Sequence, residues 1–286
     1  MSVSTPTPIR FHDVTAALSP FVLGIFRIRL EKGQLRDPQV ILPDGTCCVF
    51  LNLGPPITIV DPAGGTSFCR HQSEILARGL VSRPHYLDCS LGADLWGIKF
   101  RADLWSSWDQ DTPGVNEYRS SPAFVEPFRP LLEICKNGRT EEKILGDLTR
   151  ELEVLVPKIF TKQNPVFHGV LEEIRYAKGA AKIEEMLSEF DLPYKTAERY
   201  FARLVGTTPK DYARILRIAN ASVEMLIRSA VPTFRLRELG FFDNAHFFKD
   251  FRKFYDTSPG RFLKDLPDRS RVLARAVASV EMSLMN

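Results

Sequence analysis

A repeated pattern in the last third of the sequence constrains the fold more than any other feature. At an offset of 50 residues, Phe201 recurs as Phe251 and Pro209 recurs as Pro259. Thr207 also recurs as Thr257, and chemically similar residues match at the same offset: Arg199 and Lys249, Arg203 and Lys253, Thr208 and Ser258, Tyr212 and Phe262, Arg214 and Lys264. Such self-similarity is typical of one supersecondary unit that occurs twice.

The first copy predicts two helices separated by a short break. Residues 180–190 carry the first helix, and Pro193 suits the first turn of the second, where its missing N–H needs no partner. The second helix continues to Val205 and ends at Gly206, a residue type common just after helix C-termini. A helix, a tight break and a second helix with a buried stripe and a basic outer face form the helix-turn-helix pattern.

The second copy repeats this pattern around Gly240. Residues 233–239 predict the supporting helix, and Asp243 is a good N-cap for a second helix that starts at Asn244 and ends near Tyr255. The expected buried stripe of this helix consists of Phe247, Phe251 and Phe254. The chain therefore predicts two helix-turn-helix units in one helical domain.

Residues 209–227 predict one continuous helix between the two units, because their apolar positions follow helical spacing. About 18 residues at 1.5 Å each give a connector of roughly 27 Å. Two second helices held by a rigid connector suit a ligand that repeats along its axis. Duplex DNA is the commonest such ligand, and its successive major-groove segments lie about 34 Å apart. The pattern predicts double-stranded DNA as the partner.

The polar outer faces of the two second helices supply the candidate DNA-binding residues. They are Lys195, Glu198, Arg199 and Arg203 in the first unit, and Asn244, His246, Lys249, Arg252 and Lys253 in the second. Lys195 and Arg199 can donate to guanine or to phosphate, Asn244 can pair with adenine, and His246 can donate to a base edge. Lys249, Arg252 and Lys253 are expected to contact phosphate, which positions the protein without reading the base sequence. Glu198 either accepts from cytosine or pairs with a neighbouring cation.

Residues 166–265 resemble the C-terminal DNA-binding domain of the AraC/XylS family of bacterial transcription regulators. The resemblance is carried by YKTAERYFARLVGTTPKDYARILR at 194–217 and by LRELGFFDNAHFFKDFRKFYDTSPGRF at 236–262. It implies a seven-helix domain in which the second helix of each unit enters the major groove, and it adds Ala245 to the candidate residues. RNA polymerase and a small-molecule effector are further candidate partners.

The sequence departs from the pattern of this family at three positions. Pro193 stands where a capping serine is usual, and Ala197 stands where leucine is usual, so the first recognition helix is expected to pack less tightly. Asp256 stands where glycine is common, in a turn that is expected to be exposed.

The N-terminal part predicts a small β-sandwich or barrel. Short apolar runs at 21–30, 40–42, 47–53, 57–60, 86–89 and 95–100 are separated by glycine and proline clusters. The segment Leu42-Pro43-Asp44-Gly45 and its surroundings resemble a cupin-like β-barrel that occurs on some AraC-type regulators. Such domains sense small molecules or dimerise, and both are expectations here.

Two helices are expected after the strands, at 122–135 and 140–160, with Thr140 as N-cap. The second carries apolar residues at spacings of three and four: Leu145, Leu148, Leu152, Leu155 and Ile159. This stripe either packs on its own domain or forms a homodimer contact. A polar linker at 162–165 separates residues 1–161, a cupin-like sensory or dimerisation domain, from residues 166–266, the helix-turn-helix domain. Residues 267–286 form a tail with one more expected helix and no assigned role.

Composition excludes several classes of protein. The five cysteines lack C-x-x-C spacing, which argues against a disulfide scaffold and a zinc ribbon. If the adjacent Cys47 and Cys48 lie on a strand, they point to opposite faces, so one is expected in the core and the other as an exposed thiol. No cofactor or metal is expected, because histidines and carboxylates lack ligand spacing and no phosphate-binding loop occurs. The absence of an apolar run of 18 residues predicts no membrane span and a cytoplasmic protein.

The fold class expected is therefore α+β: a small cupin-like β-barrel plus helices, followed by an all-α domain with two helix-turn-helix units. The function expected is a sequence-specific DNA-binding transcription regulator and not an enzyme. Two alternatives remain open at this point. One is a β-barrel enzyme that acts on a small molecule and carries a helical regulatory domain. The other is a protein-interaction module built on the stripe in 140–160.

Overall fold

The N-terminal strands form two antiparallel sheets in a computed structural model that describes residues 8–60, 68–71, 74–108, 114–138, 140–160, 164–233 and 235–283. The larger sheet has the order β1 (Ile9–His12), β2 (Val22–Leu30), β9 (Ala93–Arg101), β4 (Thr46–Asn52), β7 (Ile75–Arg78), β10 (Tyr118–Arg119). The smaller sheet has the order β3 (Gln39–Ile41), β8 (His85–Asp88), β5 (Ile57–Val60), β6 (Phe68–His71). The expected β-rich N-terminal part is confirmed, and its described strands form two sheets instead of one closed barrel.

The turn at 43–45 connects the two sheets. Its preceding strand β3 pairs with β8, whereas the following strand β4 pairs with β7 and β9. The two strands therefore do not form a hairpin with each other. Gly45 has a φ of +71°, a left-handed conformation that favours glycine. The chain uses this glycine to cross from one sheet to the other.

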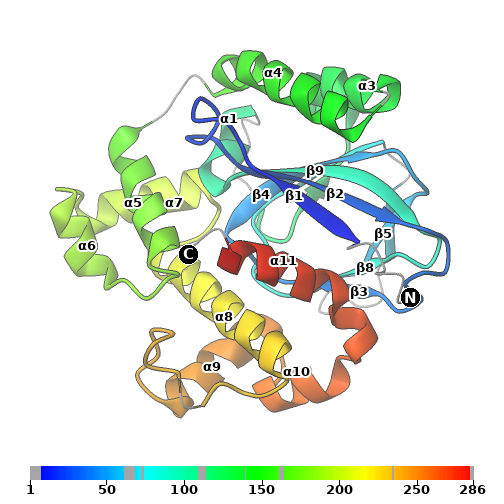
Figure 1. Cartoon of the computed structure of the whole chain (residues 1–286). Helices are drawn as coiled ribbons and strands as arrows, with labels where there is room; N and C mark the ends of the chain where they lie inside the picture. The colour runs from blue at the N-terminus through cyan, green and yellow to red at the C-terminus, as the bar shows by residue number, and fades with distance from the viewer. Residues whose placement is uncertain are drawn as a thin grey trace.

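Both faces of the larger sheet are covered, which explains why one prediction about the cysteines is wrong. Helices α3 (Arg129–Asn137) and α4 (Glu141–Ile159) cover one face, and the smaller sheet lies against the other (Figure 1). Cys47 packs among residues of the helical side, and Cys48 packs in the cluster between the sheets. Their exposed fractions are 0% and 1%, so neither is an exposed thiol.

The two helices expected after the strands are present in a modified form. The first is divided into α2 (Pro122–Val125), a 3₁₀ turn (Glu126–Phe128) and α3, because prolines occupy the start of each piece. Thr140 caps α4 as expected, with its side chain accepting a hydrogen bond from the Lys143 amide. Leu148 and Leu152 of the α4 stripe are fully buried against the sheet of their own chain. This burial favours packing within the domain over the homodimer contact.

The helical C-terminal part follows the predicted order. Its helices are α5 (Pro165–Tyr176), α6 (Ile183–Glu189), α7 (Tyr194–Leu204), α8 (Pro209–Arg228), α9 (Asn244–Tyr255) and α10 (Pro259–Asp265). The connector α8 runs between α7 above and α9 below in Figure 1. Residues 236–240 form consecutive turns after a bend at Arg235, instead of the expected supporting helix. Part of the expected linker at 162–165 lies outside the described residues.

The sequence repeat is also a structural repeat. Thr208 and Ser258 cap α8 and α10 in the same way, each accepting a hydrogen bond from the amide three residues later. Gly206 and Asp256, which are also 50 residues apart, both have left-handed backbones with φ of +78° and +52°. An aromatic pair follows in each copy: Phe201 and Tyr212 rings lie 5.7 Å apart, as do those of Phe251 and Phe262.

The tail crosses back to the N-terminal part. It forms a 3₁₀ turn (Asp268–Arg271) and α11 (Val272–Ser283), which packs against α8, β3 and β1. The side-chain amide of Gln39 joins the two parts, because it donates to the Arg269 carbonyl at 2.7 Å and accepts from the Leu273 amide. Within the described part of the chain, no helix has the length and apolar character needed to cross a bilayer.

Candidate nucleic-acid interface and apolar cavity

Helix α7 has one buried and one basic face. Ala197 and Phe201 are fully buried. The opposite side exposes Lys195, Arg199 and Arg203, at i, i+4 and i+8. Among the residues that the structure describes, Lys195 and Arg199 have no ion-pair or hydrogen-bond partner in the chain, so their donors face solvent.

Other α7 candidates are more constrained. The Arg203 guanidinium lies 5.7 Å from the ring centre of Tyr200, close enough for a cation–π contact on the same helix. Glu198 is half-buried. Pro193 is the N-cap residue of α7, one position earlier than the sequence predicts, and its side chain provides no capping hydrogen bond. Helix α7 also packs against η2 (Ala102–Leu104) and α1 (Trp105–Trp108) of the N-terminal part.

Helix α9 presents a longer polar face. Its N-terminus is capped by Asp243, whose carboxylate accepts from the His246 amide at 2.7 Å. The exposed candidates on this face are Asn244, Ala245, Lys249, Arg252 and Lys253. Phe248 lies among them with 40% of its surface exposed, and the sequence analysis did not single it out. An exposed aromatic ring on such a face can contact the methyl group of thymine.

His246 is held by the protein on both sides of its ring. Its Nδ1 accepts from the Phe242 amide at 3.3 Å, and its Nε2 lies 3.3 Å from an Asp250 carboxylate oxygen. The Phe241 ring packs edge-on at 5.6 Å. These contacts give His246 a role in fixing the N-terminal turn of α9, in addition to any base contact.

Asp250 joins α9 to the connector α8 and was missed by sequence reasoning. It is 4% exposed, and its oxygens lie 3.8 Å from Arg214 Nε and 3.7 Å from Arg217 Nη2. A second link is formed by Lys253, whose Nζ lies 2.7 Å from an Asp211 oxygen at the start of α8. The available sequence signal is the i, i+4 spacing of His246 and Asp250.

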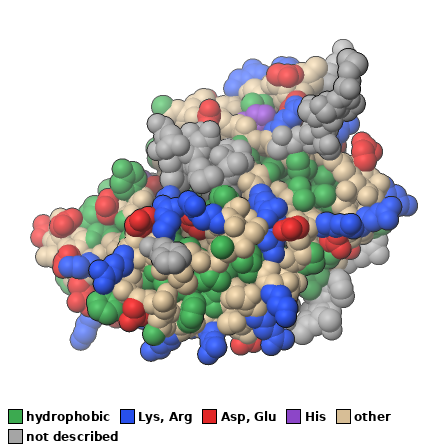
Figure 2. Space-filling model, turned by 60° about the horizontal axis from the view of Figure 1, so that its bottom comes forward, with side chains coloured by type: hydrophobic (Ala, Val, Ile, Leu, Met, Phe, Trp, Pro, Cys, Tyr) green, Lys and Arg blue, Asp and Glu red, His purple; other side chains and the backbone are tan. Residues whose placement is uncertain are grey.

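Basic side chains are spread over the side of the molecule that carries α9 and α10. Figure 2 shows this side, with lysine and arginine groups separated by hydrophobic and acidic ones. The arrangement is a set of separate cationic points instead of one continuous patch. Separate points fit contacts to individual bases and phosphates better than a uniform electrostatic surface does.

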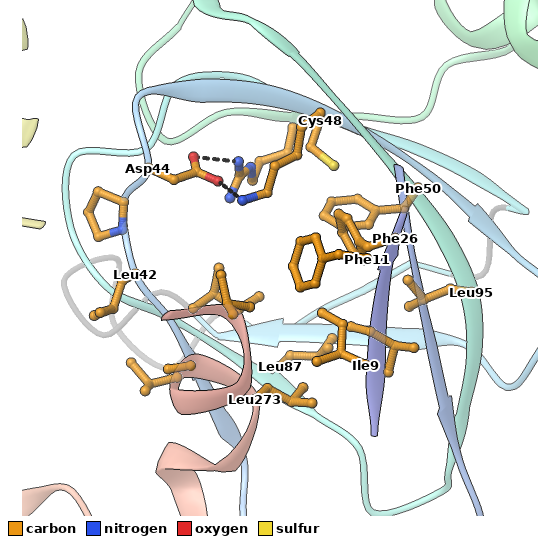
Figure 3. Close-up of a pocket in the computed structure, with 18 of the residues that line it drawn as sticks. Ile9, Phe11, Phe26, Leu42, Asp44, Cys48, Phe50, Leu87, Leu95 and Leu273 are labelled. Carbon is orange, nitrogen blue, oxygen red and sulfur yellow. Dashed lines mark hydrogen bonds and ion pairs between the residues drawn. The ribbon is translucent and has the colours of Figure 1, made fainter. Parts of the chain in front are cut away.

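An apolar cavity lies where the N-terminal sheets meet the C-terminal helices. It encloses about 100 Å³, room for several water-sized groups. Phe11, Phe26 and Phe50 form one side (Figure 3), and α11 contributes Leu273, Ala274 and Val277. Val223 of the connector α8 completes this wall. The tail, which had no role in the sequence analysis, therefore closes a cavity.

One end of this cavity is charged. Asp44 accepts from Arg78 Nη2 at 3.0 Å, and its other oxygen lies 3.0 Å from Lys99 Nζ (Figure 3). Burial alone would raise the pKa of Asp44, but the two cations outweigh burial and hold this pKa well below its usual value. Arg78 is 2% exposed, and its Nε has no hydrogen-bond partner within the described residues.

Comparisons with known proteins bear on the C-terminal part. Residues 186–265 match the family model of a helix-turn-helix domain. No curated protein matches the chain. Among solved structures, ToxT from Vibrio cholerae is similar at 11% identity and a TM-score of 0.46, over 84% of this chain and 97% of that one. The AraC-like transcriptional activator CuxR is similar at 14% identity and a TM-score of 0.23, over 76% and 86%.

Proposed function

We propose that this chain, whose residues 186–265 are a helix-turn-helix domain of the AraC type, is a DNA-binding transcription regulator that contacts two adjacent major-groove segments. In this proposal, α7 enters one segment and α9 enters the next. The connector α8 sets their separation, since its 20 residues span roughly 30 Å. That length is close to the repeat of about 34 Å in duplex DNA.

The observation that carries this proposal is the equivalence of the two units. Arg199 on α7 and Lys249 on α9 occupy the same position in the repeat, and both are exposed. Their helices bury the equivalent residues Phe201 and Phe251, with exposed fractions of 0% each. This equal burial supports an equivalent orientation of the outer faces of α7 and α9, each with its cation directed away from the buried ring.

Individual roles follow from the contacts of each side chain. Arg199 is exposed and has donors suited to guanine, and the exposed Asn244 amide can both donate to and accept from adenine, so we assign both to base reading. Lys249 and Arg252 are assigned to phosphate, which adds affinity and salt dependence without sequence preference. Phe248 is assigned to a thymine methyl group because its exposed ring lies between these polar residues.

The cavity is assigned to a small effector. Cavities that bind small molecules are mostly apolar with a few placed polar groups, and this one combines an aromatic wall with the Asp44 cluster. Its lining includes residues of α8 and α11, so a ligand there would contact both parts of the chain.

Selection of bound sequences from a random duplex library tests the DNA assignment. The full chain is expected to select two blocks of preferred bases about one helical turn apart. Arg199→Ala should remove preference at one position in one block and Asn244→Ala at one position in the other, each costing about 1–3 kcal/mol. Lys143→Ala on α4, far from both helices in sequence, is the matched control and should leave both blocks intact. Selection of no sequence by the full chain would refute the proposal.

A further inference from the structure

The turn at 43–45 lies between the cavity and the connector helix. Asp44 contributes its side chain to the charged end of the cavity, and the next residue, Gly45, packs against α8. Two consecutive residues thus serve two different parts of the molecule. A shift of this backbone segment would therefore change both the charged end of the cavity and the contact with α8.

On the cavity side, the turn is held by the Asp44 carboxylate. One oxygen accepts from Arg78, from the Thr46 hydroxyl at 2.8 Å and from the Thr46 amide at 3.2 Å. The other oxygen is paired with Lys99. Because these donors already occupy the carboxylate, the polar end of the cavity offers a ligand cationic donors and not acceptors. The best partner for such donors is an anionic acceptor, since charge-assisted hydrogen bonds are the strong ones.

On the helix side, the turn is held by α8. The Tyr212 hydroxyl donates to the Gly45 carbonyl at 2.8 Å, and a Cβ on Gly45 would lie 2.5 Å from a Leu216 methyl carbon. Tyr212 is fully buried, and its ring packs on Phe201 of α7. The turn therefore contacts α8 directly through Tyr212, and it is linked to α7 through the packing of Tyr212 on Phe201.

We propose that the cavity binds an apolar molecule with one anionic group, and that this group competes with Asp44 for Lys99 and Arg78 and so loosens the 43–45 turn from α8. The consequence of this loosening, a change in how α7 and α9 contact DNA, rests on the proposed function. The ligand class itself rests on the cavity alone. No covalent step is involved, since the ligand exchanges one set of ion pairs for another.

Binding of two probes to the full chain tests the ligand class. Octanoate and 1-octanol share an eight-carbon chain and differ in the anionic group. Calorimetry is expected to show octanoate binding about tenfold more tightly than octanol, the factor that one charge-assisted hydrogen bond supplies. Lys99→Met should remove most of this preference, whereas Lys143→Met on α4 should retain it. Equal affinity of the two probes, an unchanged preference in Lys99→Met, or no octanoate binding would overturn the proposal.

Hydrogen exchange of the Thr46 amide tests the loosening of the turn, because this amide donates to the Asp44 carboxylate. Octanoate should accelerate its exchange in the wild type, and octanol should not. If Lys99→Met is unstable, the comparison of octanoate with octanol on the wild-type chain still tests the ligand class, because it needs no variant. Octanoate binding without faster Thr46 exchange would overturn the coupling. None of these measurements includes DNA, so a failure of the DNA-binding proposal would appear separately in the sequence selection.

Discussion

The Tyr212 hydroxyl donates a hydrogen bond to the Gly45 carbonyl, 167 residues earlier in the chain, at 2.8 Å. Burial raises the pKa of Tyr212 far above its usual value, so the hydroxyl keeps its proton and remains a donor at physiological pH. This bond connects the turn between the two sheets to the first helical turn of the connector. Through this bond, a movement of the N-terminal turn can act directly on the connector α8.

Replacement of Gly45 by alanine should weaken this contact. The new Cβ meets Leu216, and the φ of +71° adds backbone strain of about 1–2 kcal/mol. Gly33→Ala is a matched control, because Gly33 has a φ of +76° and no atom lies within 4 Å of the place that its new Cβ would take. Denaturant unfolding of both variants should show a larger loss for Gly45→Ala. Equal losses would mean that the turn does not pack tightly on α8.

Replacement of Asp44 by asparagine should destabilise the fold in a pH-dependent way. The folded pKa lies below the unfolded value, so the carboxylate contributes stability above about pH 4, and this contribution is lost as the pH falls toward the folded pKa. At pH 7 the loss should be about 3 kcal/mol, because Arg78 is left buried without its charge partner. The difference from wild type should begin to shrink as the pH falls below about 4, and it should continue to shrink as the pH falls further toward the folded pKa of Asp44.

Asp256→Asn is the control for this pH series. Asp256 is exposed and left-handed, a conformation that asparagine also tolerates, so its replacement should have little effect at any pH. A constant difference between Asp44→Asn and wild type from pH 7 to pH 3 would contradict the ion-pair assignment.

Replacement of Asp250 by asparagine should weaken the contact between α9 and the connector α8. The change removes the negative charge that lies among Arg214, Arg217 and His246, at a cost of about 3 kcal/mol in unfolding free energy. Affinity for all DNA sequences should fall together, because the whole recognition helix loses its position. Asp243→Asn on the same helix is the control, since asparagine caps helices as well as aspartate does. A selective loss at one base position would instead make Asp250 a direct reader.

Local signals in the sequence were sufficient for much of the helical part. The apolar periodicity of residues 209–227 predicts α8 almost to the residue, and the Asp243 cap does the same for α9. These features depend on neighbours a few residues away. The helix predicted at residues 233–239 is wrong, because the described residues of this segment form turns. The segment is short and begins directly after Pro232.

Long-range contacts were beyond what the sequence could supply. Whether Cys48 faces solvent depends on a second sheet that arrives from other parts of the chain. The ion pairs of Asp250 with Arg217 and of Asp211 with Lys253 join α8 to α9, and no local spacing specifies a pair between two helices. The cavity was not located either, since its walls combine strands from the first hundred residues with the tail at Leu273.

Protection of guanine N7 from methylation tests the central claim most directly, because this atom lies in the major groove. The full chain, bound to a duplex from the sequence selection, should protect two groups of guanines about one helical turn apart on one side of the duplex. Arg199→Ala should lose protection in one group only. Protection of a single group, or loss of both groups in Arg199→Ala, would contradict a protein that places one recognition helix in each of two groove segments.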